Sequence, residues 1–374
     1  MKKVLFVASI TKHILSFHIP YLQYLKEKGY EIHVASNGEE AIPFCDKHFQ
    51  LEFQRSPFAK ENRSVYKKLK KIIEEENYQM IHCHTPVASV LTRLAAEKAR
   101  KHGTKVLYTA HGFHFYHGAP LKNWLFFYPI EKYLAKYTDA LITINEEDYT
   151  FAKRKLKAKK IYHIHGIGVE PSKFDFDMSE KKREEIRASF TVSSLDYLMM
   201  YAAELNDNKN QQMLIDAMKK LVPLYPNMKL ILAGIGPLKE KFEKEIQENF
   251  LQSNVFLIGY RTDIPELLKI SDLYVATSKR EGLPVNILEA MIAGLPLVVT
   301  NSRGQRELVE DGKNGYIVEL NDVNSLVEKI QNIYVDQRIQ TQFTKYAKNH
   351  IENYLLSNVK REMKTIYDEV EKTC

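Results

Sequence analysis

One segment of the chain places two glutamates on either side of a predicted strand-to-helix turn. Residues 272–317 read DLYVATSKREGLPVNILEAMIAGLPLVVTNSRGQRELVEDGKNGYI. The apolar run 273–277 predicts a buried strand, so Glu281 falls in the loop at its carboxyl end. Glu289 falls inside the helix that follows. The two carboxylates can accept hydrogen bonds from hydroxyl groups at opposite ends of one ligand.

The start of that helix is suited to an anion. Pro284 stands where a first helical residue is expected, and Gly294 with Pro296 predicts the helix end. From Pro284 to Glu289 the axial rise is about 7.5 Å. Backbone N–H groups of the loop and of the helix N-terminus would point at a nearby negative charge. An extended ligand with hydroxyls at both ends and phosphate between them, such as a nucleotide-sugar, fits this arrangement.

The surrounding sequence predicts the elements that position these residues. Short apolar runs rich in β-branched residues alternate with longer amphipathic stretches. In the first half, strands are predicted over 4–9, 31–36, 80–84, 105–111 and 140–145, with helices over 17–28, 63–77 and 87–102. In the second half, strands are predicted over 197–203, 229–234, 254–259, 273–277 and 296–300, with helices near 209–222, 238–250, 264–270 and 284–293.

This alternation predicts the α/β class, with parallel sheets covered by helices on both faces. We expect two Rossmann-like domains, over 1–170 and 196–340, joined by a linker at 171–195, which is polar and lacks a strand pattern. A helical segment, 341–374, follows. Ligands of such sheets bind beyond the carboxyl ends of the strands, so we expect the site in a cleft between the two domains.

Composition excludes several classes. Of 374 residues, 44% are hydrophobic and 27% charged, values of an ordinary globular protein rather than a disordered one. No run approaches the roughly 18 apolar residues of a membrane span, so an integral membrane protein is not expected. Three cysteines are too few and too scattered for a disulfide framework or a zinc site, which favours the cytoplasm. His82 and His84 flank Cys83, but no third ligand is spaced to help them bind a metal.

Charge is unevenly distributed. Residues 1–170 hold 27 Lys and Arg against 17 Asp and Glu, whereas the other 204 residues hold 27 against 30. A basic domain could face nucleic acid, an anionic membrane or a phosphorylated substrate. No groove-entering motif is present, so no nucleic-acid partner is expected. The aromatic stretch 113–128 and the basic stretch 153–160 are typical of a surface that contacts anionic headgroups, or else of a core-facing helix and a solvated loop.

The whole chain resembles the retaining glycosyltransferases of family 4, which have the GT-B fold. Glu281-x7-Glu289 stands with G-L-P at 282–284, A-G-L-P at 293–296 and the downstream E-L-V-E-D-G-K-N-G. The runs FHIPYL (17–22), IHCHTP (81–86), YTAHGFHFYHGAPLKNW (108–124) and AAELNDNKNQ (202–211) are similar to the bacterial exopolysaccharide and capsule branch.

The resemblance implies a role for each matching residue. Glu289 would bind the ribose hydroxyls of the nucleotide, and Lys209 its diphosphate. Glu281, with Gly282, Leu283 and Pro284, would contact the donor sugar and phosphate. Gly234 and Gly236 match the glycine turn of the nucleotide domain. His111 would face the reacting sugar from the acceptor domain, and the final helix would cross back onto that domain.

Two positions depart from the family pattern. Where the family has an arginine that pairs with the diphosphate, this chain has Glu204. Arg261, Lys279 or Arg280 would then substitute, or Lys209 would act with the helix N-terminus. The first loop reads SITKH in place of paired glycines, so His13 and His18 would make acceptor contacts there.

The resemblance implies a metal-independent enzyme without a cofactor. It would transfer a sugar, a hexose or an N-acetylhexosamine from a UDP donor, onto a polyprenyl-diphosphate-linked saccharide for exopolysaccharide or capsule synthesis. The enzyme would lie peripherally on the cytoplasmic face of the membrane. Two alternatives remain open at this stage: a nucleotide-sugar epimerase on the same fold, and a non-catalytic partner subunit of a transferase complex.

Overall fold

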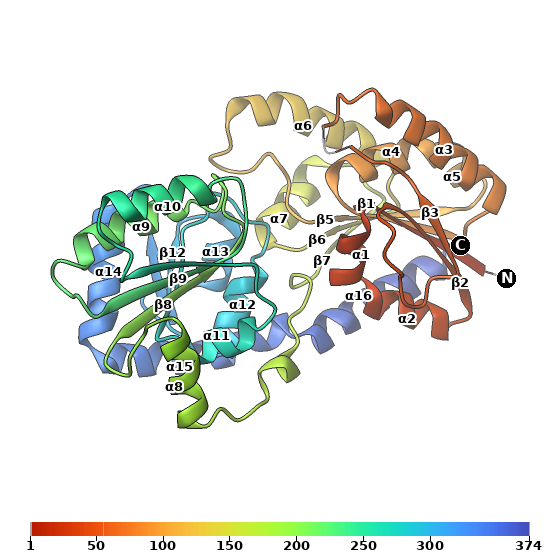
Figure 1. The fold of residues 1–374 in the computed structure, drawn as a ribbon. Coiled ribbons are helices and arrows are strands. Elements are labelled where there is room, and N and C mark those ends of the chain that lie inside the picture. Colours follow the sequence, from red (N-terminus) through yellow and green to blue (C-terminus); the bar gives the residue numbers. More distant parts are fainter. Residues whose placement is uncertain (1, 55, 374) are drawn as a thin grey trace. The chain divides into compact units, whose positions relative to one another are not determined.

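The computed structural model describes residues 2–54 and 56–373 (Figure 1). The chain divides into two compact units. Unit 1 comprises Met1–Ile167 together with Ser357–Cys374, and unit 2 comprises Gly168–Leu356. Each unit has its own parallel sheet and its own apolar core, which are described in turn.

Unit 1 is built on a seven-stranded sheet with the order β3-β2-β1-β4-β5-β6-β7. All neighbouring strands pair in parallel. Their bounds are β1 Lys2–Ile10, β2 Tyr30–Asn37, β3 Lys47–Gln50, β4 Met80–Cys83, β5 Lys105–Ala110, β6 Ala140–Thr143 and β7 Lys160–His163. The central strands are apolar and buried, because helices cover both faces of the sheet.

The helices of unit 1 form a layer on each face. Helices α3, α4 and α5 lie on one side of the sheet, and α1, α2 and α16 on the other (Figure 1). Their bounds are α1 Thr11–Phe17, α2 Ile19–Glu27, α3 Glu61–Glu76, α4 Pro86–Ala95, α5 Glu97–Lys101, α6 Leu121–Leu134, η1 Ala135–Tyr137, α7 Glu146–Lys155 and α16 Leu356–Glu371. None of the described helices is both long enough and apolar enough to cross a membrane.

Unit 2 is built on a six-stranded parallel sheet with the order β10-β9-β8-β11-β12-β13. The strands are β8 Tyr197–Ala202, β9 Met228–Ala233, β10 Val255–Gly259, β11 Leu273–Ala276, β12 Leu297–Thr300 and β13 Gly315–Val318. The helices are η2 Pro171–Phe174, α8 Glu180–Ser189, α9 Gln211–Leu221, α10 Lys239–Glu248, α11 Ile264–Ile270, α12 Val285–Ile292, α13 Arg303–Leu308, α14 Val323–Val335, α15 Gln337–His350 and η3 Ile351–Tyr354. Two Rossmann-like units with parallel sheets confirm the predicted fold class.

Each sheet has one point where the order of its strands reverses. In unit 1 the reversal lies between β1 and β4, and in unit 2 between β8 and β11. The loops that leave the carboxyl ends of these neighbouring strands run to opposite faces of the sheet, which opens a crevice for a ligand. These two points are therefore where functional side chains are expected.

The last helix belongs to unit 1, as the resemblance implied. The Tyr367 hydroxyl of α16 lies 2.7 Å from Nδ1 of His82, which stands in the buried strand β4. Tyr24 donates a hydrogen bond to Asp368 at 2.6 Å, and Glu362 lies 2.6 Å from Nδ1 of His165. The preceding tail differs from the expectation for 341–374, since α15 and η3 belong to unit 2.

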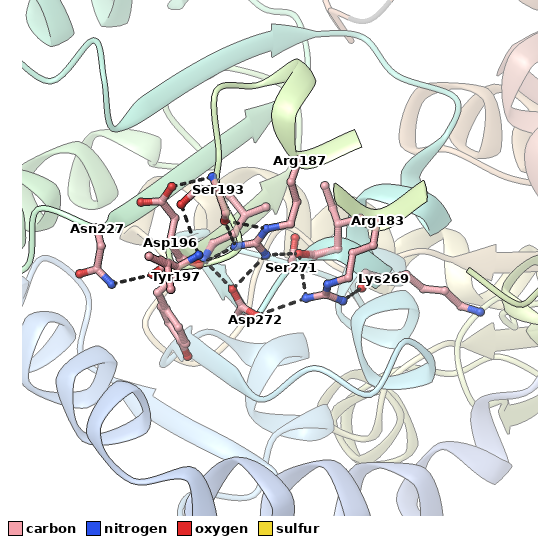
Figure 2. A network of polar contacts seen from close by, with 12 residues as sticks. Arg183, Arg187, Ser193, Asp196, Tyr197, Asn227, Lys269, Ser271 and Asp272 are labelled. Carbon is pink, nitrogen blue, oxygen red and sulfur yellow. Dashed lines mark hydrogen bonds and ion pairs between the residues drawn. The ribbon is translucent and has the colours of Figure 1, made fainter. Parts of the chain in front are cut away.

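Residues 171–195 are not an extended linker. They contain η2 and α8 and belong to unit 2. Arg187 of α8 is buried and donates hydrogen bonds to the carbonyl of Ile270 at 2.7 Å and to Asp272 at 3.3 Å (Figure 2). Arg183 also reaches Asp272, at 3.5 Å. The high charge of this segment indicated a solvated linker. Two of its arginines, both in α8, instead hydrogen-bond to backbone carbonyls and to the carboxylate of Asp272, directly before β11.

Candidate active site

The predicted lysine and glutamate meet at the reversal point of unit 2. Lys209 lies in the loop after β8, and Glu281 lies in the loop after the neighbouring strand β11. The ammonium Nζ of Lys209 is 2.6 Å from Oε1 of Glu281. Both side chains are largely buried, so this is a strong, directional ion pair rather than a solvated surface contact. It joins the two loops that an anionic ligand at this point would contact.

Hydrogen bonds to backbone carbonyls hold the two loops together. The N–H of Lys279 donates to the carbonyl of Asn208 at 2.8 Å, and the Asn208 side chain donates to the carbonyl of Arg280 at 3.1 Å. The Thr277 hydroxyl donates to the carbonyl of Asn210 at 2.9 Å. Lys209 is therefore fixed on a braced turn, which is the arrangement that preorganised charge stabilisation needs.

The first turn of helix α13, which follows β12, packs against the loop that carries Glu281. Arg303 is buried, and its Nε donates to the carbonyl of Glu281 at 3.3 Å. A Cβ on Gly304 would lie 2.4 Å from the carbonyl oxygen of Gly282, so only glycine permits this approach. The sequence analysis missed Arg303. The position of Arg303 shortly after the predicted strand 296–300 could have indicated a functional residue, because ligands bind beyond the carboxyl ends of such strands.

The two glycines after β9 allow a close approach of backbones. A Cβ on Gly234 would lie 2.0 Å from the carbonyl oxygen of Ala203, and one on Gly236 would lie 2.3 Å from that of Leu205. Gly234 also has a φ of +154°. These glycines let the loop after β9 pack directly on the loop after β8, so their observed role is to shape the turn that presents Lys209.

Glu289 lies on helix α12, which starts one residue later than expected. Pro284 is the residue before the helix rather than its first turn, with extended backbone angles. Glu289 is half-buried, and burial raises its pKa, with a smaller opposite effect from Lys173. Asn286 of the same helix donates to the carbonyl of Ala202 at 2.9 Å, which ties α12 to the end of β8. A partly desolvated carboxylate of this kind is suited to accept hydrogen bonds from a diol.

The candidates to replace the missing arginine differ in their availability. Glu204 is exposed, which agrees with a carboxylate that avoids the diphosphate position. Arg261 pairs with both carboxylate oxygens of Asp263, and Lys279 lies 2.8 Å from Asp207. The guanidinium of Arg280 has no ion pair with any residue that the structure describes. Arg280 is thus the candidate that a diphosphate could recruit without breaking an existing pair.

The acceptor-side histidines of the sequence analysis form a cluster at the reversal point of unit 1. Nε2 of His13, in α1, lies 3.3 Å from Nε2 of His111, which follows β5. The ring of His18 stacks on that of His84, which follows β4, with centroids 3.8 Å apart. Burial lowers the pKa of His13 to about 4 and holds those of the other three well below the ordinary range. All four imidazoles are therefore neutral at physiological pH.

The expectation that no third ligand is spaced to join His82 and His84 overlooked residues that the fold brings together. His13, His18 and His111, from distant segments, lie around His84. His82 plays a different part, because its Nδ1 contacts Tyr367 at 2.7 Å and its Nε2 contacts Thr109 at 2.8 Å.

Comparison with known proteins decides the family. The model of the glycosyl transferases group 1 matches residues 182–350, and that of the glycosyl transferase 4-like family matches residues 3–145. EpsD of Bacillus subtilis (strain 168), whose name describes a glycosyltransferase, is 44% identical over 334 residues, 89% of this chain and 87% of that protein. The chain belongs to glycosyltransferase family 4.

One further relative and one solved structure are informative for this family 4 glycosyltransferase. A UDP-Gal:α-D-GlcNAc-diphosphoundecaprenol α-1,3-galactosyltransferase of Escherichia coli is 31% identical over 295 residues, 78% of this chain and 74% of that protein. The crystal structure of Anabaena HepE in complex with UDP and glucose superposes with a TM-score of 0.80 at 20% identity, covering 99% of this chain and all of that one. That likeness confirms the GT-B fold of the family 4 glycosyltransferase.

Proposed function

We propose that this glycosyltransferase moves a sugar from a UDP-sugar to a lipid-linked saccharide, with retention of anomeric configuration, in exopolysaccharide or capsule synthesis. The Lys209–Glu281 pair at the reversal point of unit 2 carries the proposal. It places a cation and a hydrogen-bond acceptor side by side where a sugar diphosphate would lie. The name of the Escherichia coli relative, a galactosyltransferase that acts on GlcNAc-diphosphoundecaprenol, supports the acceptor class.

The donor would bind to unit 2 without a metal ion on its diphosphate. As the bond between the anomeric carbon and the diphosphate oxygen breaks, negative charge grows on the departing diphosphate. Lys209, Arg280 and the backbone N–H groups ahead of α12 would stabilise that charge. Glu289 would accept hydrogen bonds from the ribose hydroxyls, and Glu281 would orient the sugar, with Gly282, Leu283 and Pro284 shaping the loop.

Bond formation would follow on the same face of the sugar. The acceptor hydroxyl oxygen attacks the anomeric carbon from the side that the diphosphate leaves, and its proton passes to a phosphate oxygen of the leaving group. The products are the extended saccharide and UDP, so atoms and charge balance. His111 in unit 1 would contact the reacting sugar, and His13 and His18 would help shape the acceptor side.

Unit 1 also has a surface suited to an anionic membrane, where a lipid-linked acceptor would be found. Helix α6 exposes a face with Leu121, Leu125 and Phe126, which are 73%, 65% and 60% exposed. Exposed apolar side chains beside lysines such as Lys122 are typical of interfacial helices, and residues 153–160 add six positive charges. We propose peripheral binding of this surface to the cytoplasmic leaflet.

The test is binding and hydrolysis of UDP-, GDP- and ADP-sugars in the presence of EDTA, for the wild type and Glu289→Ala. Saturable binding of one nucleotide-sugar, weakened in the variant, would support a metal-independent donor site. A panel of lipid-diphosphate saccharides then reports transfer. A folded wild-type protein that binds none of the donors would overturn the proposal in favour of a non-catalytic partner subunit. Release of a free epimerised sugar would instead show an epimerase.

A further inference from the structure

Four histidines of unit 1 bring ring nitrogens to one point. One nitrogen each from His13, His18, His84 and His111 lies within 4.8 Å of the other three. The residues come from three segments that are distant in sequence: the region after β1, the loop after β4 and the loop after β5. Convergence of four imidazoles from three segments differs from a chance pair on one helix face.

Two of these histidines lack the hydrogen bonds that burial normally demands. His18 is 3% exposed and His84 is fully buried. Neither ring nitrogen of either residue has a hydrogen-bond partner in the described chain. Buried polar groups without a partner are rare because each costs the free energy of its lost hydration. An ion bound by one nitrogen of each ring would replace that lost interaction.

The distances are close to those of a tetrahedral metal site. Zinc–nitrogen bonds of about 2.0–2.1 Å separate the ligand nitrogens by about 3.3–3.4 Å and place ring centroids roughly 5 Å apart. His13 Nε2 and His111 Nε2 are 3.3 Å apart. Five of the six centroid separations in the cluster lie between 4.7 and 6.0 Å. The exception is the stacked His18–His84 pair at 3.8 Å, whose rings would have to part by about 1 Å to bind one ion.

We propose that His13, His18, His84 and His111 bind one divalent first-row transition-metal ion, with Zn²⁺ the best match. Imidazole nitrogens suit zinc, copper and nickel, whereas magnesium and calcium require oxygen ligands. Apolar rings surround the cluster, with Phe6 against His84. His13 and His111 are only partly buried, so an anion or a water molecule can reach the ion from their side.

The neutral state of the cluster is compatible with this chemistry, since metal ions bind the unprotonated imidazole. Bound there, the ion would fasten helix α1 to the carboxyl ends of β4 and β5 and fix the orientation of His111. It would lie in unit 1, whereas the donor diphosphate is assigned to unit 2. The inference goes beyond the proposed function, although it uses three histidines that the proposal places on the acceptor side; a failure to bind metal would leave the donor assignment in unit 2 unaffected.

The test uses full-length protein without a histidine tag, freed of metal by a chelator and then dialysed. Titration calorimetry with ZnCl₂ and elemental analysis report affinity and stoichiometry, and Co²⁺ reports coordination through its visible spectrum. We expect one ion per chain and tetrahedral Co²⁺ bands. His84→Gln should weaken binding at least about 100-fold, more than the roughly 10–100-fold typical of losing an outer-sphere partner.

Two matched controls remove a buried histidine that is not a ligand. His33 contacts Tyr78 and Glu31 through its two nitrogens, and both nitrogens of His82 are also engaged. His33→Gln and His82→Gln should keep one ion per chain. Should His84→Gln fail to fold, His13→Gln replaces a partly exposed ligand and tests the same loss. A folded wild type that binds none of Zn²⁺, Co²⁺ or Ni²⁺, or metal binding equal in ligand and control variants, would overturn the proposal.

Discussion

Lys209 and Glu281 form an ion pair, with Nζ 2.6 Å from Oε1, across the two strands between which the sheet order of unit 2 reverses. The pair sets the position of the one lysine that the family resemblance assigned to the diphosphate. Glu281 holds the ammonium of Lys209 in place before a donor binds. A bound phosphate would then contact the lysine beside Glu281. A cation fixed in this way can stabilise negative charge that develops in a transition state without first having to reorient.

Replacing Lys209 should therefore affect transfer far more than folding. We expect Lys209→Ala to lower kcat/KM for the nucleotide-sugar by roughly 10²–10³, the range seen when one preorganised donor to a developing anion is removed. Steady-state kinetics checks this. Lys220→Ala is the matched control, because Lys220 lies in the last turn of α9 of the same unit and its ammonium hydrogen-bonds only to Asn324 among the described residues. Equal activity of the two variants would contradict the assignment.

Glu289 predicts a pH dependence of nucleotide binding. Burial raises its pKa, so on acidification it takes up a proton at a higher pH than an ordinary glutamate, whose pKa is about 4.3. The protonated form accepts hydrogen bonds from the ribose less well. Affinity for UDP should therefore fall as pH decreases toward the raised pKa, and Glu289→Gln should bind more weakly but without this dependence. Calorimetry across the acidic range measures both.

The same group predicts the sign of a stability change. Because the folded-state pKa lies above the unfolded one, the folded protein pays a penalty for ionised Glu289 at neutral pH that is absent below the unfolded pKa. Glu289→Gln should raise the free energy of unfolding at pH 7 and lose that advantage at low pH. Urea unfolding at both pH values checks the sign, and a variant less stable than the wild type at pH 7 would contradict it.

The sequence predicted the interior of both sheets but not all of their edges. The predicted strands correspond to β1, β2, β4, β5, β6, β8, β9, β10, β11 and β12. The strands β3, β7 and β13 were missed, and each lies at the edge of a sheet. Their side chains are partly exposed, so residues such as Lys47 and His48 of β3 break the continuous apolar pattern by which buried parallel strands are recognised.

The donor side was more predictable than the acceptor side for a physical reason. Glu281 and Glu289 are eight residues apart on one strand–loop–helix segment, so local spacing sufficed to place them. The four histidines of unit 1 converge only because β1, β4 and β5 are neighbours in the sheet. Strand order is a non-local property, and without it His84 and His13 gave no sign of meeting.

Gly304→Ala would test how closely helix α13 packs on the loop of the proposed donor site. A Cβ there would lie 2.4 Å from the carbonyl of Gly282 and 3.0 Å from Cδ of Pro284. Gly304→Ala should lower the free energy of unfolding by about 1–3 kcal/mol, typical of overpacking, and weaken UDP binding by displacing the loop around Glu281. Gly312→Ala is the control, since nothing lies within 4 Å of its Cβ position and only its φ of +74° is strained. That variant should lose stability but keep UDP affinity.

The exposed face of α6 predicts membrane binding that two introduced glutamates should weaken. Transfer of Leu125 and Phe126 into the lipid interface should gain more than about 1.4 kcal/mol by apolar burial, so Leu125→Glu with Phe126→Glu should weaken binding to anionic vesicles roughly tenfold or more. Cosedimentation with phosphatidylglycerol vesicles measures the effect. The matched control, Leu224→Glu, alters a leucine of unit 2 that is 64% exposed, and it should leave vesicle binding unchanged. Added salt should weaken wild-type binding as well, because the lysines beside this face attract the headgroups through screened charge. Equal sedimentation of the wild type, the double variant and Leu224→Glu would contradict the assignment of α6 to the membrane-binding surface.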